Sequence, residues 1–443
     1  MAELDPLYTA EEMRAADAGH DVDAMMRRAG EAVAQELMRR FPDARRIALH
    51  AGGGANGGDG RIAGETLTAQ GRELVDERPD VVIDALLGTG LKGAPRDETS
   101  DLIEQINGAG APVLAVDIPS GVNASTGEVA GAAVRADVTV TMHGPKVGLA
   151  VAPGRFHGGV VQVADIGLEA APTENRLVTP EILAEVPRRS PRDNKYSAGH
   201  VLVVGGSRGM TGAAALASRA ALRADAGYVT IAAPPESLPV LETLVLEAVK
   251  RPLDQVFEAA ERANSLAIGP GLGRSAPEQE LVRRVLAEVR LPIVVDADAL
   301  FELEPGEWPA SRVLTPHEGE LGRLLGRESK EVAAHRLASV REAAERFGCV
   351  VVLKGEDSLV AAPGRGVLVI ALGRPSLATA GTGDVLTGIT ASFLAKGMEP
   401  QRAAAAACAA QQLASHEATQ RYGLVASDVV EALPAALARD RAE

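Results

Sequence analysis

The chain has 443 residues, a length that predicts two or three domains and rules out a single small module. Hydrophobic residues make up 46% of it and charged residues 24%, which are the proportions of a folded globular protein. The 60 acidic residues exceed the 45 Lys and Arg and leave a formal net charge of -15. This charge argues against nucleic acid and anionic membranes as partners.

The cysteines and the first residues of the chain indicate the cellular compartment in which the protein works. Cys349 and Cys408 are the only cysteines, and both are flanked by apolar residues, which argues against disulfides and for a reducing environment. The first residues lack the basic start and apolar stretch of a secretory signal, and no apolar run is long enough to span a membrane. We therefore expect a cytoplasmic protein.

The first half of the chain alternates helical and β-rich patterns. Residues 9–39 repeat apolar side chains every three or four positions, and Thr9 and Glu12 have the spacing of a capping box, which predicts one or two helices. Short β-rich runs follow at residues 46–50, 81–83, 112–116, 138–140 and 160–163. Helix-compatible stretches separate several of these runs, a pattern typical of an α/β domain.

A domain junction interrupts this pattern. Periodicity is lost after Gly167, and residues 187–193 are polar and broken by prolines. We place the junction between residues 168 and 178, with a tether or short helix running to about residue 193. The predicted domains are residues 1–175 and 176–443.

The second half contains apolar runs that are almost continuous, as expected of strands covered by helices on both faces. They are residues 201–204, 228–232, 265–268, 292–295, 312–314 and 349–353. We predict a second α/β domain with a parallel-type sheet. Gly- and Asp-rich motifs follow the strands in both halves, and the carboxyl ends of parallel strands meet at one edge of a sheet, so each half should have one ligand site.

In the second half, a Gly-rich turn over residues 379–383 precedes a helix-compatible apolar stretch. Glycines permit tight turns, and free N–H groups at a helix start bind phosphate oxygens. Asp384 could accept a proton from a hydroxyl group that attacks phosphorus. Taken alone, so short a Gly-rich motif favours the simpler interpretation of a tight turn in which Asp384 only caps the helix. Further charged candidates follow neighbouring strands: Asp296, Asp298, His317, Glu320 and Lys354.

In the first half, residues 57–60 form a Gly-rich loop, and Asn56, Asp84 and Asp117 add oxygen atoms suited to a hard cation. An oxygen-only cluster argues against zinc. The alternative interpretation is that both aspartates cap helices.

The motifs of the second half come in a characteristic order: residues 194–200, 205–207, 210–213, 269–273, 296–300, 314–320, 353–355 and 378–386. Over residues 178–435 this order resembles the carboxyl-terminal half of the bifunctional NAD(P)H-hydrate repair enzymes. The resemblance implies a ribokinase-like fold and an ADP- or ATP-dependent NAD(P)H-hydrate dehydratase that also uses Mg²⁺. It differs at Asp225, where the family often has Gly, and at Gln411 and Gln412, where a His-Gly pair is expected.

By this resemblance, Asp384 deprotonates the hydroxyl group of the hydrated ring, and phosphorylation turns that hydroxyl into a leaving group. The residues implied for the nucleotide are Lys354, Gly355, Glu356, Asp357, Ser358, Thr379, Ala380, Gly381, Thr382 and Gly383. Those implied for the hydrated dinucleotide are Gly273, His317, Glu318, Gly319, Glu320, Leu321, Gly322, Arg323 and Asp384.

The first half is similar to the NAD(P)H-hydrate epimerase part of the same enzymes, over residues 8–168. The matching motifs are residues 26–30, 56–60, 84–90, 117–121 and 144–149. The resemblance implies a Rossmann-like fold, Asp117 as the acid/base, and K⁺ bound by Asn56, Asp84 and Ser120. The residues implied for the substrate are Asn56, Gly57, Gly58, Asp59, Gly88, Thr89, Gly90, Leu91, Lys92, Gly93 and Asp117.

This half departs from the family in three places, one of which is Arg27, where Glu is common. Ala55 stands where an Asn is usual, and the segment between Asp59 and Asp84 is too short for the strand–helix unit expected there. We therefore expect a shortened domain.

Two alternatives stay open from the sequence. The chain could be a ribokinase-like small-molecule kinase, which would release a phosphorylated product instead of NAD(P)H and phosphate. Its first half could be a non-catalytic module that binds dinucleotides or mediates assembly. In each case the partners are small molecules, and we expect a homo-oligomer.

Overall fold

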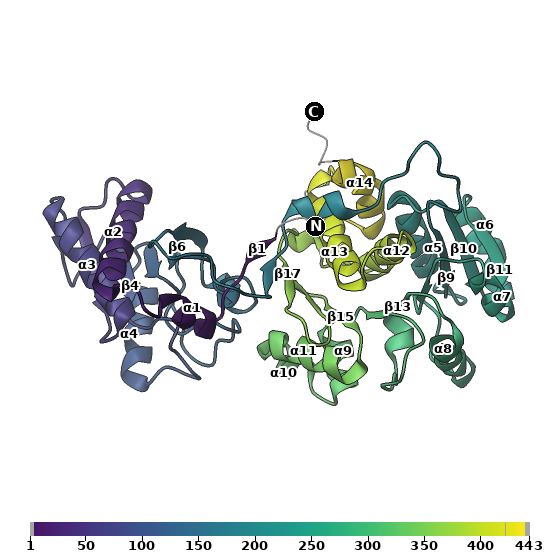
Figure 1. The fold of residues 1–443 in the computed structure, drawn as a ribbon, viewed down its shortest axis with the longest axis horizontal. Helices are drawn as coiled ribbons and strands as arrows, with labels where there is room; N and C mark the ends of the chain where they lie inside the picture. The colour runs from purple at the N-terminus through teal and green to yellow at the C-terminus, as the bar shows by residue number, and fades with distance from the viewer. Residues whose placement is uncertain (1–3, 421, 439–443) are drawn as a thin grey trace. The chain divides into compact units, whose positions relative to one another are not determined.

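The structure is a computed structural model that describes residues 4–420 and 422–438 (Figure 1). Its contacts divide the chain into two compact units. The first is formed mainly by Pro6–Arg176, and the second mainly by residues 177–333 and 338–438. Within the described part of the chain, no helix is both long and apolar enough to cross a membrane.

The first unit is built on a six-stranded sheet in the order β3-β2-β4-β5-β6-β7, in which every neighbouring pair is parallel. The strands are β2 (Arg46–Ala51), β3 (Glu73–Leu74), β4 (Val81–Ala85), β5 (Val113–Val116), β6 (Val138–Met142) and β7 (Val160–Ala164). The helices are α1 (Ala10–Asp17), α2 (Val22–Arg40), α3 (Ala55–Ala69) and α4 (Asp97–Gly108), with 3₁₀ turns η1 (Val147–Leu149) and η2 (Gly154–Phe156).

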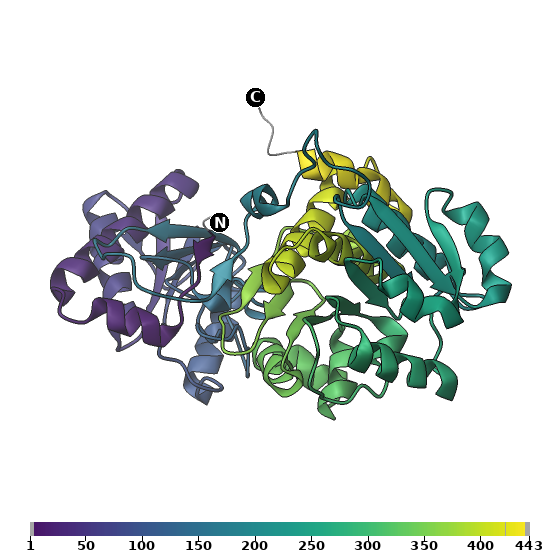
Figure 2. The same cartoon turned by 45° about the vertical axis from the view of Figure 1, so that its right-hand side comes forward.

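Successive side chains of the strands point to opposite faces of this sheet, and both faces are buried. Val81 and Ile83 of β4 belong to the core formed with α2 and α3, whereas Val82 belongs to the core that includes Ile103 and Ile106 of α4. Helices therefore lie on both faces (Figure 2), and the predicted Rossmann-like α/β class is confirmed.

Two local predictions for this unit also hold. Thr9 Oγ1 accepts from the Glu12 backbone N–H at 3.2 Å, and the Glu12 carboxylate accepts from the Thr9 N–H at 2.7 Å, which is the predicted capping box. The shortening between Asp59 and Asp84 is visible as well. β3 has two residues, and the chain runs from it to β4 without a helix.

The second unit contains the larger sheet, in the order β1-β8-β17-β16-β15-β14-β13-β12-β9-β10-β11. Its strands are β1 (Asp5–Pro6), β8 (Arg176–Leu177), β9 (His200–Val204), β10 (Tyr228–Ala233), β11 (Val249–Pro252), β12 (Ser265–Ile268), β13 (Ile293–Val295), β14 (Arg312–Leu314), β15 (Val350–Leu353), β16 (Ser358–Ala361) and β17 (Leu368–Ile370). The block from β11 to β15 is parallel, as predicted, but β16 and β17 are antiparallel and were not predicted.

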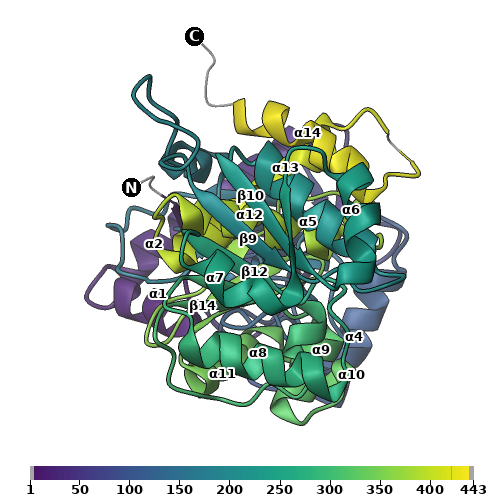
Figure 3. The ribbon, with the colours of Figure 1, turned by 90° about the vertical axis from the view of Figure 1, so that its right-hand side faces the viewer.

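Helices cover both faces of the larger sheet (Figure 3). They are α5 (Thr211–Arg223), α6 (Leu238–Leu244), α7 (Val256–Ala260), α8 (Ala276–Glu288), α9 (Glu318–Leu325), α10 (Ser329–Ala334), α11 (Arg336–Phe347), α12 (Thr382–Ala395), α13 (Pro400–Glu417) and α14 (Ala426–Ala438). The 3₁₀ turns are η3 (Pro180–Glu185), η4 (Pro235–Ser237), η5 (Leu253–Gln255), η6 (Ala297–Leu300) and η7 (Pro375–Leu377). α12 packs on α5 and α13, and the consecutive alanines of α13 are completely buried, so small side chains bring these helices close together.

Asp225 explains one departure from the family pattern. It has a left-handed backbone with φ of 68°, a conformation in which Gly carries no steric cost. Its carboxylate pairs with Arg189 at 2.7 Å and with Lys396 at 2.8 Å. These ion pairs offset part of the backbone strain.

Candidate active sites

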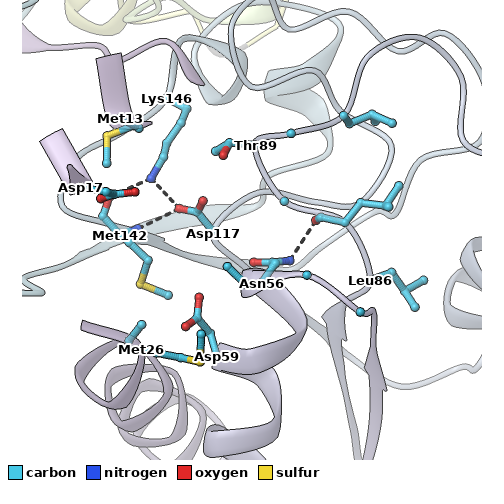
Figure 4. A pocket seen from close by; sticks show the side chains of 18 of the residues that line it. Met13, Asp17, Met26, Asn56, Asp59, Leu86, Thr89, Asp117, Met142 and Lys146 are labelled. Carbon is cyan, nitrogen blue, oxygen red and sulfur yellow. Dashed lines mark hydrogen bonds and ion pairs between the residues drawn. The ribbon is translucent and has the colours of Figure 1, made fainter. Parts of the chain in front are cut away.

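The first unit contains a cavity of about 770 Å³ at the carboxyl ends of its strands (Figure 4). Its walls come from the chain after β2, β4, β5 and β6, and from α1 and α2. The residues implied for the substrate that line it are Asn56, Asp59, Gly88, Thr89, Gly90, Leu91, Lys92 and Asp117. Gly57 and Gly58 instead permit close packing, because a Cβ atom would lie 1.9 Å from the Gly52 carbonyl oxygen or 2.6 Å from Met26 Sδ, respectively.

Asp117 lines this cavity beside Lys146, a lysine to which the sequence analysis assigned no role. Lys146 is completely buried, and its Nζ donates to Asp117 Oδ1 at 2.5 Å and to the Met142 carbonyl oxygen at 2.7 Å. The Met142 backbone N–H donates to the same carboxylate oxygen at 3.0 Å. The motif over residues 144–149 contained Lys146, but nothing in its spacing indicated that the side chain turns inward onto Asp117.

Two more carboxylates line the cavity. Burial raises the pKa of Asp59 to about 7, and the negative charges of Asp117 and Asp17 add to the shift. Burial also raises the pKa of Asp17, which comes from the end of α1 and was not predicted. A carboxyl group with a pKa near neutral, such as that of Asp59, can both accept and donate a proton, as acid/base chemistry requires.

The predicted cation ligands form one hydrogen-bonded chain beside the cavity. Asp84 is completely buried, and its carboxylate accepts from Ser120 Oγ at 2.6 Å and from the Ser120 N–H at 2.8 Å. Ser120 Oγ in turn accepts from the Leu87 N–H at 2.9 Å, and Asn56 Nδ2 donates to the Leu87 carbonyl oxygen at 2.9 Å.

Two features of this chain fit a cation. Asn56 Oδ1 is buried without a hydrogen-bond partner, and burial raises the pKa of Asp84 to about 6, because a buried carboxylate favours its neutral form. An unsatisfied amide oxygen beside a buried carboxyl group is a suitable ligand set for a hard monovalent ion.

In the second unit, the predicted anion site is the first turn of α12. Gly381 precedes the helix with φ of 89°, which requires Gly, and the first N–H groups of a helix have no partner within it. Thr382 Oγ1 donates to the Thr379 carbonyl oxygen at 2.8 Å and closes the turn. Asp384 lies in this turn, where burial raises its pKa to about 7 and the nearby charge of Asp296 adds to the shift.

A buried ion pair lies next to this turn. Lys354 Nζ pairs with Asp296 Oδ1 at 2.9 Å, and Thr387 Oγ1 donates to Asp296 Oδ2 at 2.8 Å. Burial disfavours the charge of Asp296, but Lys354 outweighs that effect and holds the pKa of this carboxyl group below its ordinary value. A Cβ atom on Gly383 would lie 3.3 Å from Lys354 Nζ, so the lysine ammonium is adjacent to the start of α12.

Among the other residues implied for the two ligands, Glu320 has its carboxylate 3.9 Å from Lys354 Nζ. His317 caps α9 through its Nδ1, which accepts from the Gly319 N–H at 3.0 Å, and Glu320 closes the capping box. Leu321 and Gly322 are buried in the core, whereas Arg323 is exposed. The Gly273 N–H donates to Asp298 at 2.9 Å.

Gln411 and Gln412, at the place of the expected His-Gly pair, fasten the predicted nucleotide segments to α13. Gln411 Nε2 donates to the Thr382 carbonyl oxygen at 2.5 Å, and Gln412 Nε2 donates to Ser358 Oγ at 3.3 Å. Gln412 Oε1 also accepts from the Leu372 N–H at 2.6 Å. The sequence analysis assigned these glutamines no role, because no sequence pattern shows which glutamines of a buried helix form hydrogen bonds to neighbouring segments.

Lys354→Met should lower the free energy of unfolding by about 3–5 kcal/mol, because it leaves Asp296 buried without its cation. Urea denaturation measures this loss, and the double variant Lys354→Met/Asp296→Asn should recover part of it. Lys330→Met is the matched control, since Lys330 is 85% exposed and its loss should change stability by less than about 0.5 kcal/mol. Equal stability of Lys354→Met and the wild type would contradict a structural role for the pair.

Two family models match the chain. One, described as NAD(P)H-hydrate dehydratase, matches residues 201–435, and the other, described as YjeF-related protein N-terminus, matches residues 22–77 and 68–148. The bifunctional NAD(P)H-hydrate repair enzyme Nnr of Salinibacter ruber is 38% identical over 84% of this chain and 73% of its own length. The enzyme of the same name from Escherichia coli is 35% identical over 95% and 91%.

The chain belongs to the family of bifunctional NAD(P)H-hydrate repair enzymes. The family membership predicted from the motifs of both halves is thereby confirmed, and the alternative of an ordinary small-molecule kinase is not supported.

Solved structures agree for the second unit. The ADP/ATP-dependent NAD(P)H-hydrate dehydratase of Bacillus subtilis, co-crystallised with ATP and Mg²⁺, superposes with a TM-score of 0.54 and 29% identity, over 59% of this chain and 97% of that one. A ribokinase-like superfamily protein of Enterococcus faecalis has the same TM-score at 24% identity, over 61% and 98%. The predicted ribokinase-like fold is confirmed.

Proposed function

We propose that the second unit dehydrates the S form of hydrated NADH or NADPH at the expense of ADP or ATP, and that the first unit interconverts the R and S forms. The observation that carries this proposal is the position of Asp384, whose desolvated carboxyl group lies in the first turn of α12 beside the Lys354–Asp296 pair.

In the proposed dehydration, the ring hydroxyl oxygen attacks the terminal phosphorus of the nucleotide while Asp384 accepts its proton. The bond between that phosphorus and the rest of the nucleotide breaks. The N–H groups of Gly381 to Gly383 stabilise the charge on the transferring group. The ring C–O bond then breaks with loss of phosphate, and loss of a ring proton restores the double bond of NAD(P)H. This two-step route replaces hydroxide by phosphate as the leaving group.

We propose two binding segments for the nucleotide, residues 354–358 and 379–383, which Gln412 and Gln411 anchor to α13. The accessible residues of the segment 317–323, which include His317 and Arg323, would hold the hydrated dinucleotide together with Gly273. Mg²⁺ supplies charge neutralisation when it is bound. Among the described residues no group of three or more His, Cys, Asp or Glu could hold a metal, so the nucleotide phosphates would supply most of its ligands.

The dehydratase rate should depend on the ionisation of Asp384. Only the carboxylate accepts a proton, and burial raises the pKa of Asp384 to about 7, so single-turnover rates should rise with pH and level off above about pH 8. Rapid-mixing measurements of NADH formation between pH 5.5 and 8.5 test this. A rate that does not change across this range would contradict the assignment of Asp384 as the base.

For the first unit, we propose Asp117 as the acid/base, and K⁺ held by Asn56, Asp84 and Ser120. The unpartnered Asn56 Oδ1 and the buried Asp84 support this cation site. A bound K⁺ would supply positive charge at the sheet edge, and Asp117 would move the proton, with Lys146 holding its carboxylate in place.

The deciding experiment incubates the full chain with separately purified R and S hydrates of NADH, Mg²⁺, and either ADP or ATP. Recovery of the reduced-nicotinamide absorbance from the S hydrate supports the dehydratase, and recovery from the R hydrate requires both activities. Accumulation of a stable phosphorylated product would support the kinase alternative instead. Replacing K⁺ by Li⁺ should slow the R-to-S step and leave dehydration of the S hydrate unchanged.

We also propose a homo-oligomer in a reducing, cytoplasmic compartment. Exposed apolar side chains gather on α6 and the turn after it, beside the edge strand β11: Val240, Leu244 and Leu246. Both cysteines are buried free thiols, which suits a reducing environment. Light scattering of the purified chain gives the mass of the assembly.

A further inference from the structure

Methionine is concentrated in the cavity of the first unit. Four of the eight methionines in the chain line it, namely Met13, Met25, Met26 and Met142, and no Phe, Tyr, Trp or His is among its lining residues. A cavity for a dinucleotide needs an apolar surface for each ring. Here thioether side chains provide that surface in place of a flat aromatic ring.

These methionines lie next to the acid/base residues. The backbone of Met142 donates to Asp117 and accepts from Lys146, so its side chain starts beside both groups. Met26 packs against the first turn of α3, where its Sδ fills the space that a side chain on Gly58 would occupy. Figure 4 shows Met13, Met26 and Met142 around the carboxylates of the cavity. A ring in reach of Asp117 therefore contacts this methionine wall.

We propose that the methionine wall, which consists of Met13, Met25, Met26 and Met142, binds the hydrated pyridine ring and determines the tolerance of this site for both epimers. The proposal rests on the epimerase function proposed above. An epimerase must hold a puckered ring in two configurations and a trigonal intermediate between them. An unbranched thioether with three rotatable bonds adapts to all three shapes, whereas a rigid aromatic plane fits the flat one best.

The charged residues that line the cavity indicate where each end of the substrate binds. Three carboxylates, Asp17, Asp59 and Asp117, lie at the methionine wall, which is unfavourable for phosphate. Lys92 and Arg96 line the cavity on the segment after β4 and suit the pyrophosphate. The proposal therefore places the reacting ring at the methionine wall and the pyrophosphate at the segment that carries Lys92 and Arg96.

The test compares two substitutions of Met26 in the full chain. Met26→Gln keeps the length of the side chain but adds a polar amide, and should raise KM for both hydrates about tenfold, because the amide loses its water against an apolar ring. Met26→Leu stays apolar and should remain within about threefold of the wild type. Met38→Gln places the same amide on α2 outside the cavity, and should leave KM unchanged.

Three readouts separate the possible outcomes. Thermal unfolding of each variant, followed by circular dichroism, reports folding of both units, and epimerisation by the wild type reports the proposed function itself. With an active wild type, an unchanged KM for Met26→Gln would overturn the methionine wall. Hydrated nicotinamide mononucleotide, which lacks the adenosine half, decides which ring is bound: the KM effect should persist with this substrate, and its loss would assign the wall to adenine and overturn the proposal.

Discussion

Asp384→Asn should reduce dehydratase turnover at least about 100-fold, because a general base contributes about 100-fold to 10,000-fold to such a rate. The amide matches the shape of the carboxyl group but cannot accept the hydroxyl proton. It also carries no charge, and since burial already raises the pKa of Asp384 to about 7, a neutral group at this position should not destabilise the fold. The measurement is NADH formation from the S hydrate at saturating nucleotide.

The other half of the same chain provides the control for this variant. Epimerisation by Asp384→Asn should equal that of the wild type, and nucleotide affinity by calorimetry should change less than about threefold, since Lys354 and the N–H groups of α12 are retained. Turnover near the wild-type value in this folded protein would remove Asp384 from the mechanism. A loss of nucleotide binding instead of turnover would assign it to binding.

Asp117→Asn should have the converse effect, with epimerisation slowed at least about 100-fold and dehydration of the S hydrate unchanged. Asn is a suitable replacement because Asp117 has φ of 65°, a left-handed conformation that Asn tolerates better than most residues. Lys146 would keep its hydrogen bonds to Thr141 Oγ1 and to the Met142 carbonyl oxygen. Chromatographic separation of the two epimers over time measures the rate.

The matched control for Asp117→Asn is Asp137→Asn. Asp137 accepts from the Val113 N–H at the opposite end of the same sheet and does not line the cavity. This variant should epimerise like the wild type even if its stability falls. Equal epimerase rates of Asp117→Asn and Asp137→Asn would show that the acid/base is another carboxyl group, with Asp59 the next candidate because burial raises its pKa to about 7.

The fold could be predicted where one local signal was enough. The capping box at Thr9 and the apolar runs that became β9, β10 and β12 follow directly from residue type and spacing. The antiparallel pair of β16 and β17 was missed because each strand is short, and because its pairing with β15 reverses the direction that the preceding strands suggest. Pro363 and Gly364, in the turn between the two strands, were the available signal.

The sites could be predicted where a motif follows a strand. Asn56, Asp84, Asp117 and Asp384 all lie at the carboxyl end of a strand or at a helix start, and topology brings such positions together. Asp17 and Lys146 could not be predicted in this way. Asp17 lines the cavity from the last residue of α1, which carries no Gly-rich motif, and the burial of Lys146 depends on three hydrogen bonds that form only in the folded chain.

If the proposed nucleotide site is correct, Gln411 and Gln412 let α13 influence catalysis, although neither side chain is one of the proposed catalytic residues. Gln411 holds the turn before Asp384 and Gln412 holds the strand after Lys354, so a slight rotation of α13 would change the distance between the two segments proposed to bind the nucleotide. Faster variants selected by laboratory evolution should therefore carry mutations among the buried alanines of α13 as well as in the loops of the proposed site.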